Sequence, residues 1–197
     1  MSPQFYTLTP KLTPLASSPV KLIEVLPVGL PQRLDTSLMV LQKSNGVSYM
    51  LDQQRWTSSL SDELHSGLSA GLQQKLGAID VYQNGLTGGK TWYTIATEFS
   101  RFDIVEHADK AATDIEVMAA WVIKRHDASP NKLSQGQYPH QLSCRMNFKN
   151  SVDSGKDFVD IVKSYQNSLN RVIDAIAIST LAVDTKQQPA IEGVICF

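Results

Sequence analysis

The segment from Gly85 to Thr91, GLTGGKT, contains a Gly-Lys-Thr triplet of the kind that binds phosphate groups in P-loops. A P-loop requires four residues between its first glycine and the Gly-Lys pair, whereas three separate Gly85 from Gly89. The segment also leads into a strand-like run, and a phosphate site of this kind needs the N-terminus of a helix behind the loop. We therefore interpret GLTGGKT as a hairpin loop.

The other residues that could do chemistry form no catalytic pattern. No histidine has a partner histidine at metal-ligand spacing, and we expect all four to be scattered on the surface: His65, His107, His126 and His140. Acidic pairs at 62–63 and 157–160 fall in the first turns of two expected helices, where the helix macrodipole explains them. The sequence contains no Gly-x-Ser-x-Gly elbow and no His-Glu-x-x-His motif. We expect neither an enzyme nor a bound cofactor.

The bulk composition predicts one globular domain. The chain has 197 residues, 42% hydrophobic and 19% charged, with a formal net charge of −1. A nucleic-acid partner would require a basic face, which these totals do not indicate. There is no apolar stretch long enough for a transmembrane helix, and no signal peptide in the sequence as it stands. The opening strand-like run at 5–8 begins so abruptly that we expect a segment upstream of it.

Two cysteines, Cys144 and Cys196, lack the spacing of a zinc site. They are either two buried free thiols or one disulfide that pins the C-terminal tail. In an oxidising compartment we favour the disulfide, which would close a loop of about fifty residues and contribute about 3–4 kcal/mol in the loop-entropy model.

Two segments have the periodicity of amphipathic helices. In the first, leucines recur every fourth residue from Leu60 to Leu76, Ser59 and Asp62 resemble a capping box, and Gly77 is a C-terminal stop. The second is expected to start at Ser154 and to end near Leu181, with one apolar stripe: Phe158, Ile161, Val162, Tyr165, Leu169, Val172, Ile173 and Ile176. Gly67 and Gly71 lie within the first helix, where each costs about 1 kcal/mol relative to alanine. The close approach that offsets this cost is either tight packing on the sheet, which we favour, or a helix face used between subunits.

The remaining segments are strand-like. We expect strands at 22–30, 38–42, 47–51, 79–82, 91–105, 114–126 and 141–150, with a polar loop at 127–138. Asn45-Gly46 predicts a tight hairpin, and a change of apolar phase near Ser100 predicts a β-bulge. The order of elements predicts an α+β fold, in which two amphipathic helices pack on one face of a mixed, mostly antiparallel sheet. We expect an N-terminal strand and linker (1–19), a single domain (20–181) and a docked tail (182–197).

The order and spacing of four features resemble those of the PqiC/YmbA lipoproteins, the auxiliary lipoprotein components of MCE-type ABC transport systems. The features are a Tyr6-x-Leu8 strand, the VLPVGLPQRLD stretch, a tryptophan before a leucine-repeat helix, and a closing amphipathic helix, and together they cover residues 5–181. Arg33 departs from the family pattern, which has an aromatic residue there. The matching motif positions are Leu30, Pro31, Leu34, Asp35, Trp56, Leu60, Leu64, Leu68 and Leu72.

This resemblance implies a lipobox cysteine upstream of Ser2 and a periplasmic protein anchored in the outer membrane by lipid. It implies a non-catalytic homo-oligomer that docks a PqiB-like MCE tunnel protein for lipid transport and membrane integrity. The alternative is a stand-alone periplasmic solute- or lipid-binding module, or a cryptic hydrolase.

Overall fold

The computed structural model describes residues 2–109, 112–128, 141–153 and 157–197, so most of the predicted polar loop at 127–138 lies outside the described residues. The elements follow the order β1 (Gln4–Tyr6), β2 (Leu22–Val25), β3 (Leu38–Lys43), β4 (Ser48–Trp56), α1 (Leu60–Leu76), β5 (Ile79–Asp80), β6 (Trp92–His107), β7 (Ala112–His126), β8 (Gln141–Asp153), α2 (Phe158–Thr185) and β9 (Val194–Cys196).

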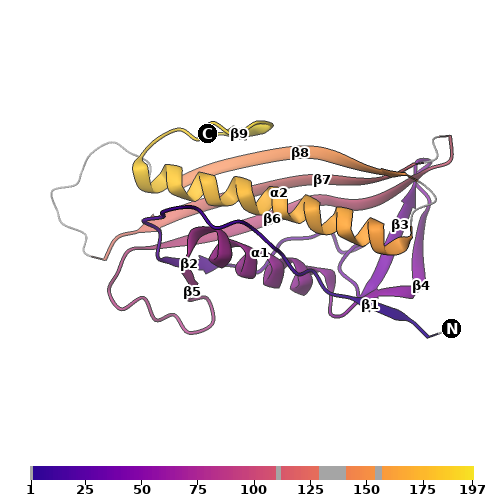
Figure 1. Cartoon of the computed structure of the whole chain (residues 1–197), viewed down its shortest axis with the longest axis horizontal. Coiled ribbons are helices and arrows are strands. Elements are labelled where there is room, and N and C mark those ends of the chain that lie inside the picture. Colours follow the sequence, from indigo (N-terminus) through magenta and orange to yellow (C-terminus); the bar gives the residue numbers. More distant parts are fainter. Residues whose placement is uncertain (1, 110–111, 129–140, 154–156) are drawn as a thin grey trace.

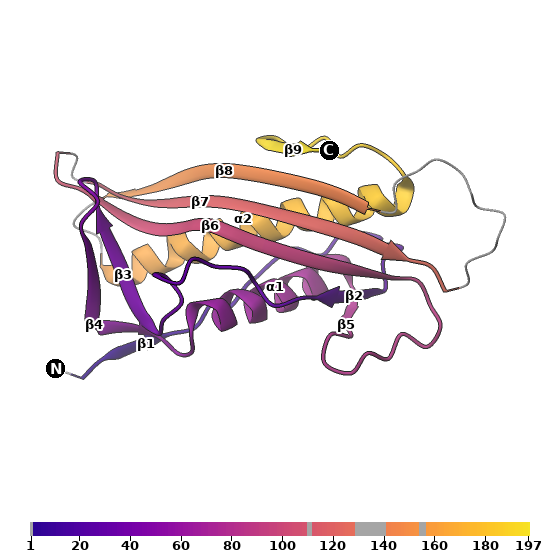
Figure 2. The same cartoon turned by 180° about the vertical axis from the view of Figure 1, so that it is seen from behind.

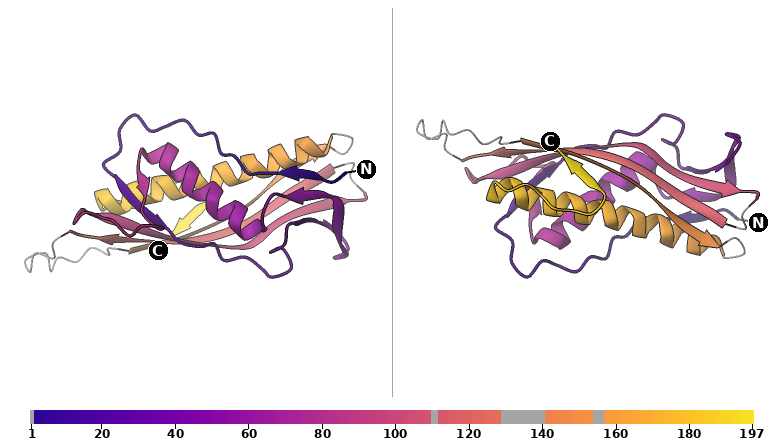
Figure 3. Two further views of the ribbon diagram at one scale, coloured as in Figure 1. Left: turned by 90° about the horizontal axis from the view of Figure 1, so that it is seen from below. Right: turned by 90° about the horizontal axis from the view of Figure 1, so that it is seen from above.

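The described strands form one mixed sheet in the order β1-β4-β3-β6-β7-β8-β9, and β2 joins it beside β6 with β5 at its far side. The long pairings of β6 with β7 and of β7 with β8 are antiparallel, whereas β2 and β3 lie parallel to different halves of β6. Both helices lie on one face of the sheet, in front of the long strands in Figure 1 and behind them in Figure 2. Figure 3 shows the resulting two layers edge-on. The α+β prediction is confirmed.

The core lies between these layers. Alternate residues of β7 from Ile115 to Ile123 face it, and α2 covers them with a stripe from Tyr165 to Ile176. The predicted bulge is confirmed, because the β6–β7 register shifts between Phe99 and Arg101 and both Phe99 and Phe102 are therefore buried.

The caps of α1 agree with its sequence signals. Ser59 adopts an extended conformation and its hydroxyl accepts a hydrogen bond from the Asp62 amide, while Gly77 is left-handed with φ of 61°. The Asn45-Gly46 hairpin also forms, but its turn is longer than a two-residue turn. The Gly46 amide donates to the Lys43 carbonyl, and among the turn residues 44–46 a positive φ occurs at Gly46 alone. This pattern is a three-residue loop with a bulge at the glycine.

Several predicted boundaries are wrong, among them the end of β4, which runs to Trp56 rather than to Leu51. Helix α2 begins at Phe158, with Asp157 as N-cap, because β8 continues to Asp153 opposite Ala112. It ends at Thr185 rather than near Leu181, since Ala182 and Val183 are buried against the body. Strand β2 stops at Val25, before Pro27, which lacks the amide hydrogen that a strand ladder needs. Within the described residues, neither helix is long and apolar enough to cross a membrane.

Candidate functional site

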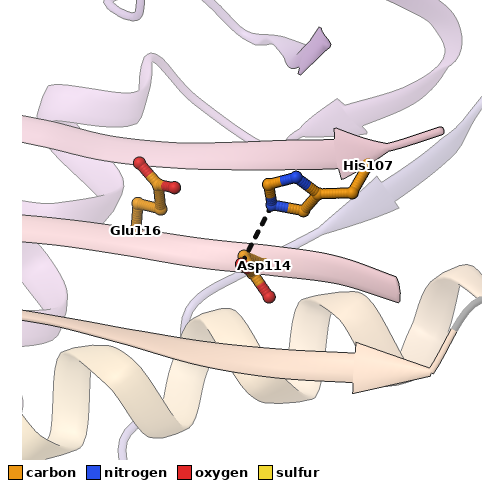
Figure 4. Close-up of side chains that lie close together, drawn as sticks. All are labelled: His107, Asp114 and Glu116. Carbon is orange, nitrogen blue, oxygen red and sulfur yellow. Dashed lines mark hydrogen bonds and ion pairs between the residues drawn. The ribbon is translucent and has the colours of Figure 1, made fainter. Parts of the chain in front are cut away.

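A cluster of charged side chains lies on the helix-free face of the sheet, where β6 leads toward β7 (Figure 4). His107 Nε2 is 3.0 Å from an Asp114 carboxylate oxygen, and the Ser151 hydroxyl donates to the other oxygen at 2.5 Å. Lys149 Nζ lies 3.7 Å from Asp114. Three neighbouring strands supply these groups because their outward positions are in register.

Asp103 is the buried centre of the other half of the cluster, with 1% of its side chain exposed. The Arg33 guanidinium donates to its two oxygens at 2.5 and 3.0 Å, and Arg101 Nε donates at 3.3 Å. Arg101 also reaches Glu116 at 2.7 Å. The hydrogen bond to Asp103 raises the pKa of Arg33 despite partial burial. A buried carboxylate is tolerated when such paired hydrogen bonds replace its hydration.

His107, Asp114 and Glu116 are the described residues best placed to hold a metal ion, with candidate ligand atoms within 4.8 Å of one another. Their carboxylates already have cationic partners in Lys149 and Arg101, which a metal would have to displace. Burial raises the pKa of Asp114, but bonds from Ser151 and His107 and the Lys149 charge outweigh it, so the pKa lies below its usual value. An ionised carboxylate held by three partners is typical of a structural ion-pair network.

The same groups do not have the arrangement of a hydrolytic triad. In a triad the serine hydroxyl contacts the histidine, and the aspartate orients the histidine from its other side. Here Ser151 and His107 both contact Asp114, so no base is placed on the hydroxyl. This geometry gives no support to the cryptic hydrolase.

The three histidines in the described residues are scattered over the fold and partly exposed, and each of them has a partner. His65 Nε2 lies 2.8 Å from the Val25 carbonyl oxygen, and the His126 ring stacks on Trp92 at 4.5 Å between centroids. Burial, followed by Lys124, lowers the pKa of His126. His107 is held in the charged cluster, and His140 lies outside the described residues. Their partners come from distant segments, which spacing alone does not show.

The family-motif positions gather around the N-terminus of α1. Leu34 and Trp56 are buried, and Trp56 packs on Tyr165 of α2 with ring centroids 5.0 Å apart. The Asp35 carboxylate accepts a hydrogen bond from the Ser61 amide in the first turn of α1. All four motif leucines of α1 are buried: Leu60, Leu64, Leu68 and Leu72. Leu30 and Pro31 are partly exposed and lead into this region. These positions hold the fold together and present no reactive group.

Gly67 and Gly71 are buried inside the chain, so they do not form the exposed subunit-contact face that the sequence suggested. A Cβ atom on Gly67 would lie 2.8 Å from Leu169 Cδ2, and one on Gly71 would lie 2.5 Å from Ile173 Cδ1. The two glycines therefore allow α1 to approach α2. The favoured packing on the sheet was also wrong, because the close neighbour is the other helix.

The sulfur atoms of Cys144 and Cys196 form a disulfide, 2.06 Å apart. The bridge joins β8 to β9, the short strand in which the tail docks antiparallel to β8. It is one of the two arrangements that the sequence left open, and it ties the C-terminus to the core sheet.

A hollow of about 490 Å³ opens at the end of the molecule where β3, β4 and the start of α2 meet. Its apolar wall is formed by Leu41, Leu51, Phe158 and Ile161. Polar residues of β4, β6 and β8 complete it, among them Asp52, Gln54, Glu106 and Asp153. Sequence reasoning missed this site because six elements supply its wall, and no local spacing signals such an assembly.

Comparison with known proteins gives a family and a fold. Residues 6–177 match the family model described as ABC-type transport auxiliary lipoprotein component. A crystal structure titled only as an uncharacterized protein has a TM-score of 0.61 at 20% identity, covering 90% of this chain and 97% of its own. Protein XCC0632 from Xanthomonas campestris, of family DUF330, has a TM-score of 0.64 at 15% identity, covering 93% and 98%. The search of curated proteins found no match. At these identities the two structures show a shared fold.

Proposed function

This chain belongs to the PqiC/YmbA-like family of ABC-type transport auxiliary lipoprotein components, and we propose that it is a non-catalytic periplasmic subunit that docks an MCE-type tunnel protein at the outer membrane. The observation that carries the proposal is the family match itself, which spans strands β2 to β8, helix α1 and most of α2. A PqiB-like partner, lipid transport and assembly as a homo-oligomer are parts of this proposal.

Two features of the molecule support it. The disulfide between Cys144 and Cys196 suits an oxidising compartment such as the periplasm. Among the described residues, one group could hold a metal, and it lies in the charged cluster. Its carboxylates already form ion pairs with Arg101 and Lys149. A docking subunit needs a stable folded body and an accessible surface, and it needs no reactive centre.

The test starts from the natural gene with its upstream sequence. We expect metabolic labelling with a palmitate analogue to mark the protein, and membrane fractionation to place it with outer-membrane markers. Replacing the expected upstream lipobox cysteine with alanine is the matched control and should abolish both signals. The tagged protein should co-purify with an MCE-domain protein encoded beside it. A protein that is neither lipid-modified nor retained with an MCE partner would refute the proposal.

The alternative is a stand-alone solute- or lipid-binding module, and the hollow beside β4 is the observation that favours it. The space deeper between the layers, around Phe102 and Tyr165, measures only about 10 Å³, which is too small for a ligand. Native mass spectrometry of the purified chain discriminates the two functions. A monomer with a bound lipid of defined mass would favour the module, whereas an unliganded oligomer would favour the docking subunit.

A further inference from the structure

Strand β4 has an open edge over most of its length. On its inner side β4 pairs with β3, and on its outer side β1 pairs only with Gln54–Trp56. No other described strand lies beside Ser48–Gln53 on that outer side. The upright β4 forms one end of the molecule in Figures 1 and 2.

The backbone groups of this edge can be assigned from the hairpin ladder. The Lys43 amide donates to the Val47 carbonyl, and hydrogen-bonded pairs alternate along an antiparallel ladder. The Leu41–Tyr49 pair is therefore bonded across the hairpin, whereas Ser48 and Met50 direct their amides and carbonyls outward. These outward groups are available to a further strand.

Exposed apolar side chains lie along the first half of the edge and beside it. Val47, Tyr49 and Met50 are 46%, 43% and 60% exposed, and Phe5 on the neighbouring β1 is 62% exposed. Natural proteins usually protect such an edge with lysine, proline or a covering loop, because it attracts other strands. In the described part of the chain, charged protection comes from the exposed Asp52 and from Lys43, whose ammonium lies 4.9 Å from the centre of the Tyr49 ring.

The hollow described above lies directly behind this edge. The β3–β4 register skips residues 52–54, and this bulge opens the hollow beside Asp52 and Gln54. The Gln54 side-chain oxygen is buried and has no hydrogen-bond donor. The hollow therefore combines an apolar wall with a polar side that the carboxylates of Asp52, Glu106 and Asp153 line.

We propose that the open edge of β4 binds an extended segment of a partner protein as an added β-strand, with an apolar side chain in the hollow and a basic side chain near its carboxylates. This inference rests on the proposed function for the existence of a protein partner and names the surface that binds it. Strand addition of this kind obtains affinity from backbone hydrogen bonds and specificity from pockets for alternate side chains. The site continues the interface that β1 already makes with β4.

A peptide strand fits this site better than a lipid does. An acyl chain could fill the apolar wall, but it offers no partner to the outward amides of Ser48 and Met50. A second copy of this chain could offer the free side of β9, which has only three residues, or its own β4 edge, and the particle mass of Met50→Pro tests that pairing. The edge of β4 is open over six residues, from Ser48 to Gln53.

The test uses the full chain and a labelled ten-residue peptide, followed by fluorescence anisotropy at physiological salt. Every second residue of the peptide is in turn isoleucine or lysine and the residues between them are threonine, so that both kinds of side chain lie on the face toward the hollow. The control peptide has the same sequence with alternate backbone amides methylated. We expect Met50→Pro to weaken binding about tenfold, since one edge donor is lost, and Met50→Ala to weaken it about twofold. Proline fits this position because the Met50 amide faces solvent, and thermal unfolding should confirm that both variants remain folded.

A second pair of variants tests the hollow. Ile161→Trp should fill it and weaken peptide binding about tenfold, whereas Ile178→Trp, on the exposed side of α2 away from the hollow, should leave binding unchanged. Equal binding of the methylated peptide, or equal effects of the two Met50 variants, would show that apolar contact alone operates and would overturn strand addition. If Met50→Pro without peptide has a smaller particle mass than the wild type, the edge pairs with a second copy of this chain. That result would also overturn the binding of a partner strand.

The outcomes separate this inference from the proposed function. Peptide binding that depends on the Met50 amide, in a protein that does not co-purify with an MCE protein, would support the edge site and refute the MCE partner. Co-purification that Met50→Pro leaves intact would support the partner and overturn the edge as its binding surface.

Discussion

Substituting Gly71 with alanine tests whether the close approach of the two helices determines the packing of the core. A new Cβ atom would lie 2.5 Å from Ile173 Cδ1 and 3.0 Å from Leu12 Cδ1, both shorter than normal van der Waals contact. Overpacking of a core costs about 1–3 kcal/mol. Alanine in a helix interior offsets about 1 kcal/mol of this. We therefore expect Gly71→Ala to lower the free energy of unfolding by about 1 kcal/mol.

The assay is urea unfolding followed by circular dichroism, with the disulfide intact. Ser66→Ala, on the exposed face of the same helix, is the control for helix propensity and should be neutral or slightly stabilising. Ile173→Val removes the Cδ1 atom that lies nearest to the new methyl group. In the Ile173→Val background the cost of Gly71→Ala should therefore fall, and the two substitutions should show a favourable coupling energy.

Gly67 provides an internal comparison. The Cβ atom there would meet mainly the end of the Leu169 side chain, at 2.8 Å, and that end can rotate away. Gly67→Ala should therefore be less destabilising than Gly71→Ala. A Gly71→Ala variant that is more stable than the wild type by the full helix-propensity gain would refute the reasoning, as would a cost that Ile173→Val does not relieve.

Two further predictions concern stability. Cys196→Ser should lower the free energy of unfolding by about 4 kcal/mol in the loop-entropy model, since the bridged residues are 52 positions apart. Urea unfolding of both proteins with and without reductant measures this loss. If reductant still destabilises the variant, the bridge does not cause the reductant effect. The pKa of Asp114 in the folded state is below its ordinary value. The contribution of this carboxylate to stability is therefore present above the unfolded pKa of about 4 and is lost as the pH falls through the folded pKa. The stability difference between wild type and Asp114→Asn should shrink in acid, and a difference independent of pH from 7 to 2 would contradict this.

Local signals in the sequence predicted the elements well. The leucine repeat and Ser59 cap of α1, and the phase change near Ser100, each depend on residues within one turn or one strand of each other. The boundaries of α2 failed because tertiary partners decide them. Pairing with β7 extends β8 to Asp153, and burial of Val183 extends the helix beyond Leu181.

The candidate sites were less predictable than the elements. Arg33 departs from the family pattern, and nothing near it in the sequence indicates Asp103, seventy positions away, as its partner. The hollow beside β4 likewise requires the neighbouring positions of β3, β6 and α2, which depend on the order of strands in the sheet. Periodicity gives the inward face of each element, but it does not say which elements become neighbours.

The charged cluster and the open edge of β4 differ in how their polar groups are satisfied, and this difference bears on where a partner can bind. Each carboxylate of the cluster already has a cationic or hydrogen-bonding partner in the chain, so a ligand there would gain an interaction only by breaking one. The outward amides of Ser48 and Met50 face solvent and have no strand partner. An incoming strand would replace water at these amides and would break no hydrogen bond within the chain, so it gains most at the edge. The energetics of the polar groups therefore favour the edge, whichever protein supplies the strand.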